Sequence, residues 1–533
     1  MAFRHAALPL LLAAAPGVAW AQSALPAPIE SQALSQLDAW SVGALSQSQG
    51  ALPNDMWAQS DPNFIGAVFD KLPASFASPA VGHLATRVLL SGATAPPGDA
   101  QAGARQRFQA LGRLGFADPL ANMASGTGPS LSDPAIAQFA AQAELARNNR
   151  AGACQRGRDA VTDTPGAFFV HLRAYCAAVT GDRSAADLAL QVGGTDGNAA
   201  DNAWYAAAVA AAGGAPGRTP PAARYGNSLD AQLSIAGSLR PGPNALTSAS
   251  SLALVTLARN DQTPQPVRAQ ATALAFQRGL LSADNARAIL HSTPADVTTG
   301  LPGIATALRQ VEASPGTLDA ATAIATVLRQ ATTPADFNAA SLFFHNDIAA
   351  LTTAPDPGAT VLFVRAALAS GDEQLATRLA QSARQAGIDA STMAPIEAAL
   401  AVMERARGDQ ATQAVHRRIE AGGGAQTRAA ARDVTLMAAL GFTLDGWTQS
   451  FLIANPPQGG ARADPGAMAT LNSALERRAQ GEAALLVVVA AGDGPAKLDA
   501  ESAAYLIRVL RALSLDDEAR RFAVEAILAG PPN

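Results

Sequence analysis

Two cysteines, Cys154 and Cys176, are the only ones in the 533-residue chain, and they are the residues whose chemistry is clearest. They stand at similar distances on either side of Thr164-Pro165. If helices lead into and out of a turn there, equal rise per residue places both sulfurs at one level on antiparallel helices. Close-packed helices reach the Cα separation of about 4.4–6.8 Å that a disulfide needs. Because the spacing fits neither a CxxC redox pair nor a zinc site, we predict a structural disulfide.

The histidines give no metal-binding pattern, because they lie far apart and form no HExxH spacing. His171 lies beside Phe168, Leu172 and Tyr175, whose spacing is typical of the inward face of a helix. We interpret His171 as a hydrogen-bonded residue at the edge of the core. The sequence also contains no nucleophile elbow, phosphate-binding loop or dinucleotide fingerprint. We therefore predict no catalytic residue, no metal and no cofactor.

The pair Glu501-Ser502 resembles the catalytic glutamate and following serine of exported lytic transglycosylases, which carry a helical solenoid and cut peptidoglycan. A lysozyme-like domain needs on the order of 100 residues around its acid, and too few follow Glu501. Asp499 predicts an N-cap that opens an amphipathic helix at this point. A peptidoglycan- or glycan-processing hydrolase remains the alternative function, with a carboxylate pair that the sequence does not reveal.

Large aromatic side chains are the remaining candidates for a binding surface. The candidate partner-binding residues are Trp57, Trp204, Trp447 and Phe451. Aromatic residues are enriched at the centres of protein interfaces. In a chain with only 5% aromatic residues and much alanine, they also fill gaps that small side chains leave in a core. Both interpretations stay open.

Signals for the start of a helix recur along the chain. Asp133-Pro134, Thr164-Pro165, Thr263-Pro264 and Thr333-Pro334 each place an N-cap residue before a proline. The segments that follow are rich in Ala, Leu, Arg and Gln, which favour helices. Alternating β-branched residues, which indicate strands, are scarce. The predicted fold class is all-α.

Four segments, 177–190, 256–274, 366–380 and 403–419, share one outline. A Gly or Asn ends one helix and an Asp caps the next, as in stacked helical hairpins. The stretch 361–386 resembles a degenerate tetratricopeptide-type hairpin, with its small-residue positions but without its aromatic and proline marks. Because the spacing between copies is irregular, we predict a right-handed solenoid of irregular helical hairpins.

Breaks in composition divide the chain into five parts. They are a signal peptide (1–21), an N-terminal short-helix region (22–125), first helical hairpins with the disulfide and a Pro/Gly linker (126–228), a central α-solenoid (229–455) and a C-terminal helical cap (456–533). Residues 52–99, followed by Ala-rich helical pairs, resemble uncharacterised exported α-helical proteins of GC-rich bacteria. That resemblance is carried by hydrophobic, structural positions and implies no functional residue.

The N-terminus predicts export. Arg4 and His5 precede an apolar core, and Ala19-Trp20-Ala21 forms a cleavage site. No later stretch approaches the roughly 18 apolar residues of a transmembrane helix, so we expect no membrane span after signal cleavage. We place the mature chain in a bacterial periplasm, where oxidation of the cysteines is favoured.

Composition narrows the possible partners. The net charge is −5 and no basic cluster occurs, so nucleic acid is not an expected partner. The export signal, the stacked hairpins and the missing catalytic motifs predict a periplasmic, non-enzymatic scaffold or adaptor. Its expected partner is an envelope protein or polymer, in cell-envelope assembly or export, and its oligomeric state is left open.

Overall fold

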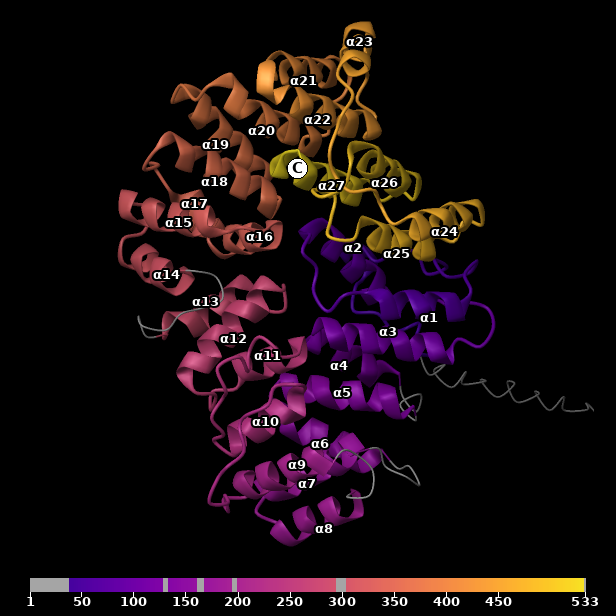
Figure 1. The fold of residues 1–533 in the computed structure, drawn as a ribbon, viewed down its shortest axis with the longest axis vertical. Helices are drawn as coiled ribbons and strands as arrows, with labels where there is room; N and C mark the ends of the chain where they lie inside the picture. Colours follow the sequence, from indigo (N-terminus) through magenta and orange to yellow (C-terminus); the bar gives the residue numbers. More distant parts are fainter. Residues whose placement is uncertain (1–37, 128–132, 161–166, 194–198, 294–302, 532–533) are drawn as a thin grey trace, which may run out of the picture. The chain divides into compact units, whose positions relative to one another are not determined.

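The computed structural model describes residues 38–127, 133–160, 167–193, 199–293 and 303–531 (Figure 1). In these ranges the chain forms α-helices, two short 3-10 helices, η1 (Gln47–Gln49) and η3 (Gly424–Gln426), and isolated β-bridges but no strand. The all-α prediction is confirmed. The right-handed course of the solenoid stays a prediction.

The helices before residue 260 are short and follow one another closely. They are α1 (Pro62–Lys71), α2 (Pro79–Leu90), α3 (Gln101–Leu114), α4 (Ala117–Gly126), α5 (Pro134–Ala146), α6 (Arg150–Asp159), α7 (Ala167–Val179), α8 (Arg183–Gly193), α9 (Ala199–Ala212), α10 (Ser228–Ala236) and α11 (Ser251–Arg259). Neighbours in sequence pack as hairpins, among them α5 with α6 and α7 with α8.

The same pairing continues through the rest of the chain, as in α14 with α15, α18 with α19 and α24 with α25. The remaining helices are α12 (Gln265–Gln277), α13 (Ala283–His291), α14 (Ile304–Ala313), α15 (Leu318–Gln330), α16 (Pro334–Phe343), α17 (His345–Ala350), α18 (Pro357–Ser370), α19 (Glu373–Gln385), α20 (Ala390–Met403), α21 (Gly408–Glu420), α22 (Thr427–Ala439), α23 (Gly446–Ala454), α24 (Pro465–Glu476), α25 (Gln480–Ala491), α26 (Ala500–Ala512) and α27 (Asp516–Ala529). Among the described helices, none is long and apolar enough to cross a membrane.

Helix caps explain why many of these elements start where they do. Asp133 and Thr333 are N-caps whose side chains accept hydrogen bonds from backbone amides of α5 and α16, as predicted. The prediction at Thr263-Pro264 is wrong in detail, because Pro264 itself takes the N-cap position of α12 and no side chain caps that helix. Thr164-Pro165 lies outside the described residues.

The hairpin turns follow the predicted outline in two of three Gly-Asp copies. Gly181 and Gly371 adopt positive φ at the ends of α7 and α18, and the following Asp182 and Asp372 accept amide hydrogen bonds from the next helix. In the third copy α21 begins one residue earlier, at Gly408. Asp409 therefore lies inside the first turn, where it favours the helix dipole without capping the helix.

The two cysteines meet between α6 and α7, which pack against each other. The Cα atoms of Cys154 and Cys176 are 5.9 Å apart and the sulfurs are at disulfide distance. This is the pairing that the hairpin geometry predicts. The bond closes a short loop and so restricts the unfolded state of this hairpin.

Reduction of this disulfide is expected to weaken the α6–α7 hairpin. The bridged residues are 22 positions apart, a loop whose closure contributes about 3 kcal/mol to the free energy of unfolding. The Cys154→Ala/Cys176→Ala variant should lose that amount in urea unfolding followed by the fluorescence of Trp204. Dithiothreitol should lower the stability of the native protein by the same amount and leave the variant unchanged. Equal sensitivity of both proteins would contradict the prediction.

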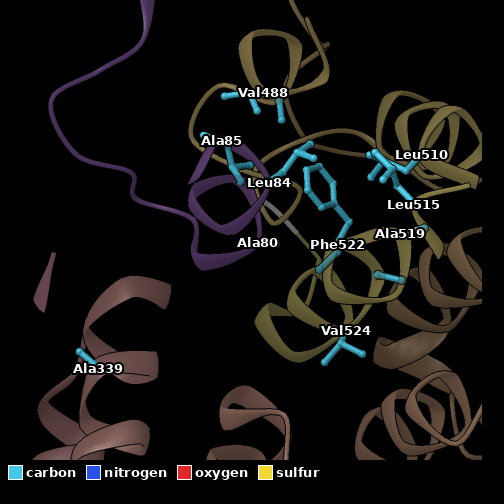
Figure 2. Packing of buried hydrophobic residues seen from close by; sticks show 14 of the residues in the cluster. Ala80, Leu84, Ala85, Ala339, Val488, Leu510, Leu515, Ala519, Phe522 and Val524 are labelled. Carbon is cyan, nitrogen blue, oxygen red and sulfur yellow. The ribbon is translucent and has the colours of Figure 1, made fainter. Parts of the chain in front are cut away.

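The N-terminal helices also pack against the C-terminal ones. Helix α1 contacts α25, and α2 contacts both α25 and α27. Figure 2 shows the Phe522 ring of α27 pointing toward Leu84 of α2, with Leu510 beside it, and all three side chains are fully buried. Within residues 38–531, helices near the start of the chain therefore contact helices near its end. In an open solenoid, by contrast, each repeat contacts only its neighbours.

Candidate binding cavity

A cavity of about 960 Å³ lies where α2 and α27 meet α16 and α18. Its walls come from α2, the end of α15, α16, α18, the residues after α20, and α27. Volumes of this size are typical of sites for small molecules and short segments. The cavity exists because α27 packs against both α2 and α18, which brings distant parts of the chain together.

Ion pairs between α2 and α27 fix one wall of the cavity. The Glu518 carboxylate is 1% exposed and lies 2.9 Å from both His83 Nδ1 and Arg87 Nη1. Burial opposes the charged form of Glu518, but these two partners outweigh burial and lower its pKa below the ordinary value. The carboxylate is therefore ionised at neutral pH and ties the two helices together.

Seven residues further along α27, Glu525 makes the second contact with α2. Its Oε2 accepts a hydrogen bond of 2.9 Å from the Ala80 amide, in the first turn of α2. Burial raises the pKa of the Glu525 carboxyl to about 7, although the Ser78 hydroxyl and the Ala80 amide favour the charged form. The two acids on one helix thus differ in charge state near neutral pH.

The Glu525→Gln variant is expected to be more stable than the native protein at pH 8. The folded-state pKa of about 7 lies above the ordinary value of 4.5, so wild-type stability is fully present below pH 4.5 and declines as pH rises through 7. Glutamine does not titrate, so the gain should grow to about 1–2 kcal/mol at pH 8. Urea unfolding at pH 5 and pH 8 measures it.

Glu518→Gln is the matched control on the same helix, and its pH dependence has the opposite sign. Because the folded pKa of Glu518 is depressed, its stabilising effect is present at neutral pH and is lost as pH falls through that pKa. The variant should therefore be destabilised at pH 8 and approach wild type in acid. If both variants showed the same pH trend, the opposite pKa shifts assigned to Glu525 and Glu518 would be contradicted.

Arg365 of α18 lines the cavity next to the end of α27. Its Nη2 donates 3.0 Å to the Leu528 carbonyl near the end of α27, and its guanidinium lies 5.2 Å from the centre of the Phe337 ring. Burial lowers the pKa of Arg365. Its Nε is buried and has no hydrogen-bond partner among the described residues.

The aromatic residues suggested by the sequence lie elsewhere. Trp57 and Trp204 are 1% and 6% exposed and belong to the core. Trp447 is 47% exposed on α23, where Phe451 is half-buried, so these two have surface available to a partner. The structure brings none of the four into the cavity.

The other residues that the sequence singled out have structural surroundings. His171 is buried and stacks on Tyr205 with 3.6 Å between ring centres, and burial lowers its pKa to about 4. Glu501 is exposed in the first turn of α26, which Asp499 caps as predicted. No group of three or more His, Cys, Asp or Glu side chains in the described ranges could hold a metal ion.

Sequence reasoning missed the cavity residues, since they are scattered from Pro79 to Pro531 and form no motif. Arginine is common throughout the chain, so no single Arg stands out. One residue of the lining could have been noticed in the sequence. Lys497 is one of only two lysines in the chain, and it lines the cavity. No protein-family model, curated protein or solved structure matches this chain.

Proposed function

We propose that the protein is an exported, non-enzymatic helical scaffold or adaptor that binds an envelope partner in the cavity between α2, α16, α18 and α27. It acts in the periplasm, in cell-envelope assembly or export. The observation that carries the proposal is the cavity itself: about 960 Å³ lined by arginine and aliphatic side chains from helices far apart in sequence. A partner there would contact helices from both ends and the middle of the chain.

Two of the three acids in the cavity lining are spaced unlike the carboxyl pair of a glycosidase. Glycosidases hold two carboxyl groups about 5–9.5 Å apart across the scissile bond. Asp517 and Glu525 both line the cavity from α27, but eight residues separate them, about 12 Å along the helix axis. Asp517 also forms ion pairs with Arg405 and Arg520. Glu373, the third acid of the lining, lies in the first turn of another helix, α19.

Site-specific cross-linking in intact cells tests the proposal. Leu342 lines the cavity and is 42% exposed, so a photo-reactive residue there disturbs little packing. We expect one defined envelope component to cross-link reproducibly at this position, and the same component, once purified, to bind the purified protein.

Leu318 is the matched control, since it is 51% exposed on α15 and lies outside the cavity lining. A photo-reactive residue at Leu318 should not capture the component found at Leu342. Trp447 provides a third position, because it is the most exposed aromatic candidate from the sequence. Capture at Trp447 alone would move the binding surface to α23, and equal capture at Leu342 and Leu318 would overturn the proposal.

A further inference from the structure

The cavity is cationic although the chain is acidic. Its lining contains three acids, Glu373, Asp517 and Glu525, against six basic side chains: Arg329, Arg365, Arg405, Lys497, Arg520 and Arg521. The formal charge of the lining is thus 6 − 3 = +3, without His83, whereas the whole chain carries −5. A cleft of one sign concentrates ligands of the opposite sign.

Three of the six basic side chains already have acidic partners. Arg329 lies 2.6 Å from Asp356, and Arg405 and Arg520 share Asp517. Arg365 and Lys497 form no ion pair in the described part of the chain, and Arg521 forms none within 4 Å, although the Asp517 carboxylate attracts it at longer range. Arg365 is the most restricted of these, because it donates to the Leu528 carbonyl and lies over the Phe337 ring.

The unpaired cations come from three different segments: Arg365 from α18, Lys497 from the segment between α25 and α26, and Arg521 from α27. Cations on separate walls suit a ligand that carries several negative groups along its length. A guanidinium also binds a carboxylate with two parallel hydrogen bonds, which adds directional selectivity.

The apolar part of the lining is mostly aliphatic. It includes Leu342, Leu362, Met403 and Val524. Phe337 is the one phenylalanine, tyrosine or tryptophan side chain in the lining, and the Arg365 guanidinium lies over its ring. Sugar rings usually pack on free aromatic faces, so this lining suits aliphatic peptide side chains better than a glycan.

We propose that the cavity binds an acidic peptide segment of the partner, with carboxylates at Arg365, Lys497 and Arg521 and aliphatic side chains against Leu342 and Leu362. The inference rests on the proposed function, and it names the chemistry of the partner at that site. Binding that does not depend on acidic groups is the alternative outcome of the experiment below.

A fluorescein-labelled peptide with four Glu and two Leu separated by Gly and Ser is the probe, and the same peptide with Gln in place of Glu is its control. Fluorescence anisotropy with the purified protein should show binding of the Glu peptide that weakens as salt rises, as expected for charge pairing. The Gln peptide should bind at least about tenfold more weakly. Equal binding of both peptides would overturn the inference.

The variant Lys497→Glu/Arg521→Glu tests the site, because both side chains are exposed and neither is needed for packing. It should weaken Glu-peptide binding on the order of tenfold or more. Arg428→Glu/Arg508→Glu is matched in net charge, with both residues exposed outside the cavity and without an ion pair in the described ranges. It should change binding at most about twofold. An equal loss in both variants would place the effect in net charge and contradict the site.

Cross-linking at Leu342 separates failure of the inference from failure of the proposed function. If the partner is still captured at Leu342 in the Lys497→Glu/Arg521→Glu variant, the cavity binds a partner but does not recognise acidic groups. If capture at Leu342 is no more specific than at Leu318, both proposals fail. Loss of capture at Leu342 in the Lys497→Glu/Arg521→Glu variant, but not in Arg428→Glu/Arg508→Glu, supports both proposals.

Discussion

Replacement of Arg107 by methionine is expected to unfold the N-terminal region at a denaturant concentration well below that of the native protein. Arg107 is 1% exposed on α3. Its guanidinium donates six hydrogen bonds to the carbonyl oxygens of Ala39, Trp40, Val42, Leu89 and Ser91, at 2.8–3.1 Å. One side chain thus joins the segment before α1, the end of α2 and α3.

The size of the effect follows from the carbonyl groups left behind. Each buried acceptor without a donor costs about 1–3 kcal/mol, partly offset because the buried charge is also removed. The net loss in the free energy of unfolding should be about 3–5 kcal/mol. Burial lowers the pKa of Arg107 to about 10, so the native side chain is still charged at neutral pH. Fluorescence of Trp40 and Trp57, whose ring centres are 5.7 Å apart in this region, reports the transition in urea.

Arg105→Met is the matched control for Arg107→Met. Arg105 is two positions away on the same helix, is exposed, and pairs with Asp133 at 2.7 Å. Asp133 is buried but still accepts hydrogen bonds from the Ala135 and Ile136 amides, so loss of this single pair should cost only about 1 kcal/mol. Similar losses for the two methionine variants would show that the carbonyl contacts of Arg107 do not stabilise this region.

The second large effect is expected at the buried pair Arg418–Asp433 between α21 and α22. Both side chains are 2% exposed, and Arg418 Nε lies 2.7 Å from Asp433 Oδ2. Burial raises the pKa of Asp433 to about 6, and Arg418 and Arg432 keep it from rising further, so the pair is charged at neutral pH. Asp433→Asn leaves the Arg418 cation buried without a counter-charge. The expected loss is about 3–5 kcal/mol.

A double variant distinguishes a broken pair from lost packing. Arg418→Met/Asp433→Leu removes both charges and keeps much of the side-chain volume, so it should recover most of the stability lost in Asp433→Asn. Trp447 is a suitable probe, since its ring lies 4.9 Å from that of His416 on α21. If the double variant is as unstable as Asp433→Asn, packing by Arg418 and Asp433 is the main contribution at this site.

The sequence predicted the features that depend only on residues close together in the chain. The N-caps at Asp133 and Thr333 depend on neighbouring amides, and the pairing of Cys154 with Cys176 depends on one hairpin. The start of α21 was misjudged by one residue, since Gly408 can enter the first turn before Asp409.

The candidate site could not be predicted, because it depends on contacts between distant segments. The Ala80 amide and Glu525 are 445 positions apart, and no periodicity connects them. Burial is set in the same way: the sequence shows Trp57 and Trp447 as equivalent aromatic residues, and only tertiary packing makes one 1% and the other 47% exposed.

The contact between α2 and α27 has a consequence for how the protein reaches its native state. During synthesis, Ala80 and His83 emerge hundreds of residues before Glu518 and Glu525, their partners. The hairpins in between form from local contacts, which are fast, whereas closure of α2 on α27 requires a very long loop and is slow. The nascent chain therefore carries Leu84 without its partner Phe522 until α27 has been made. An exposed apolar surface of this kind is prone to aggregation, so its burial by α27 is the step that completes the fold.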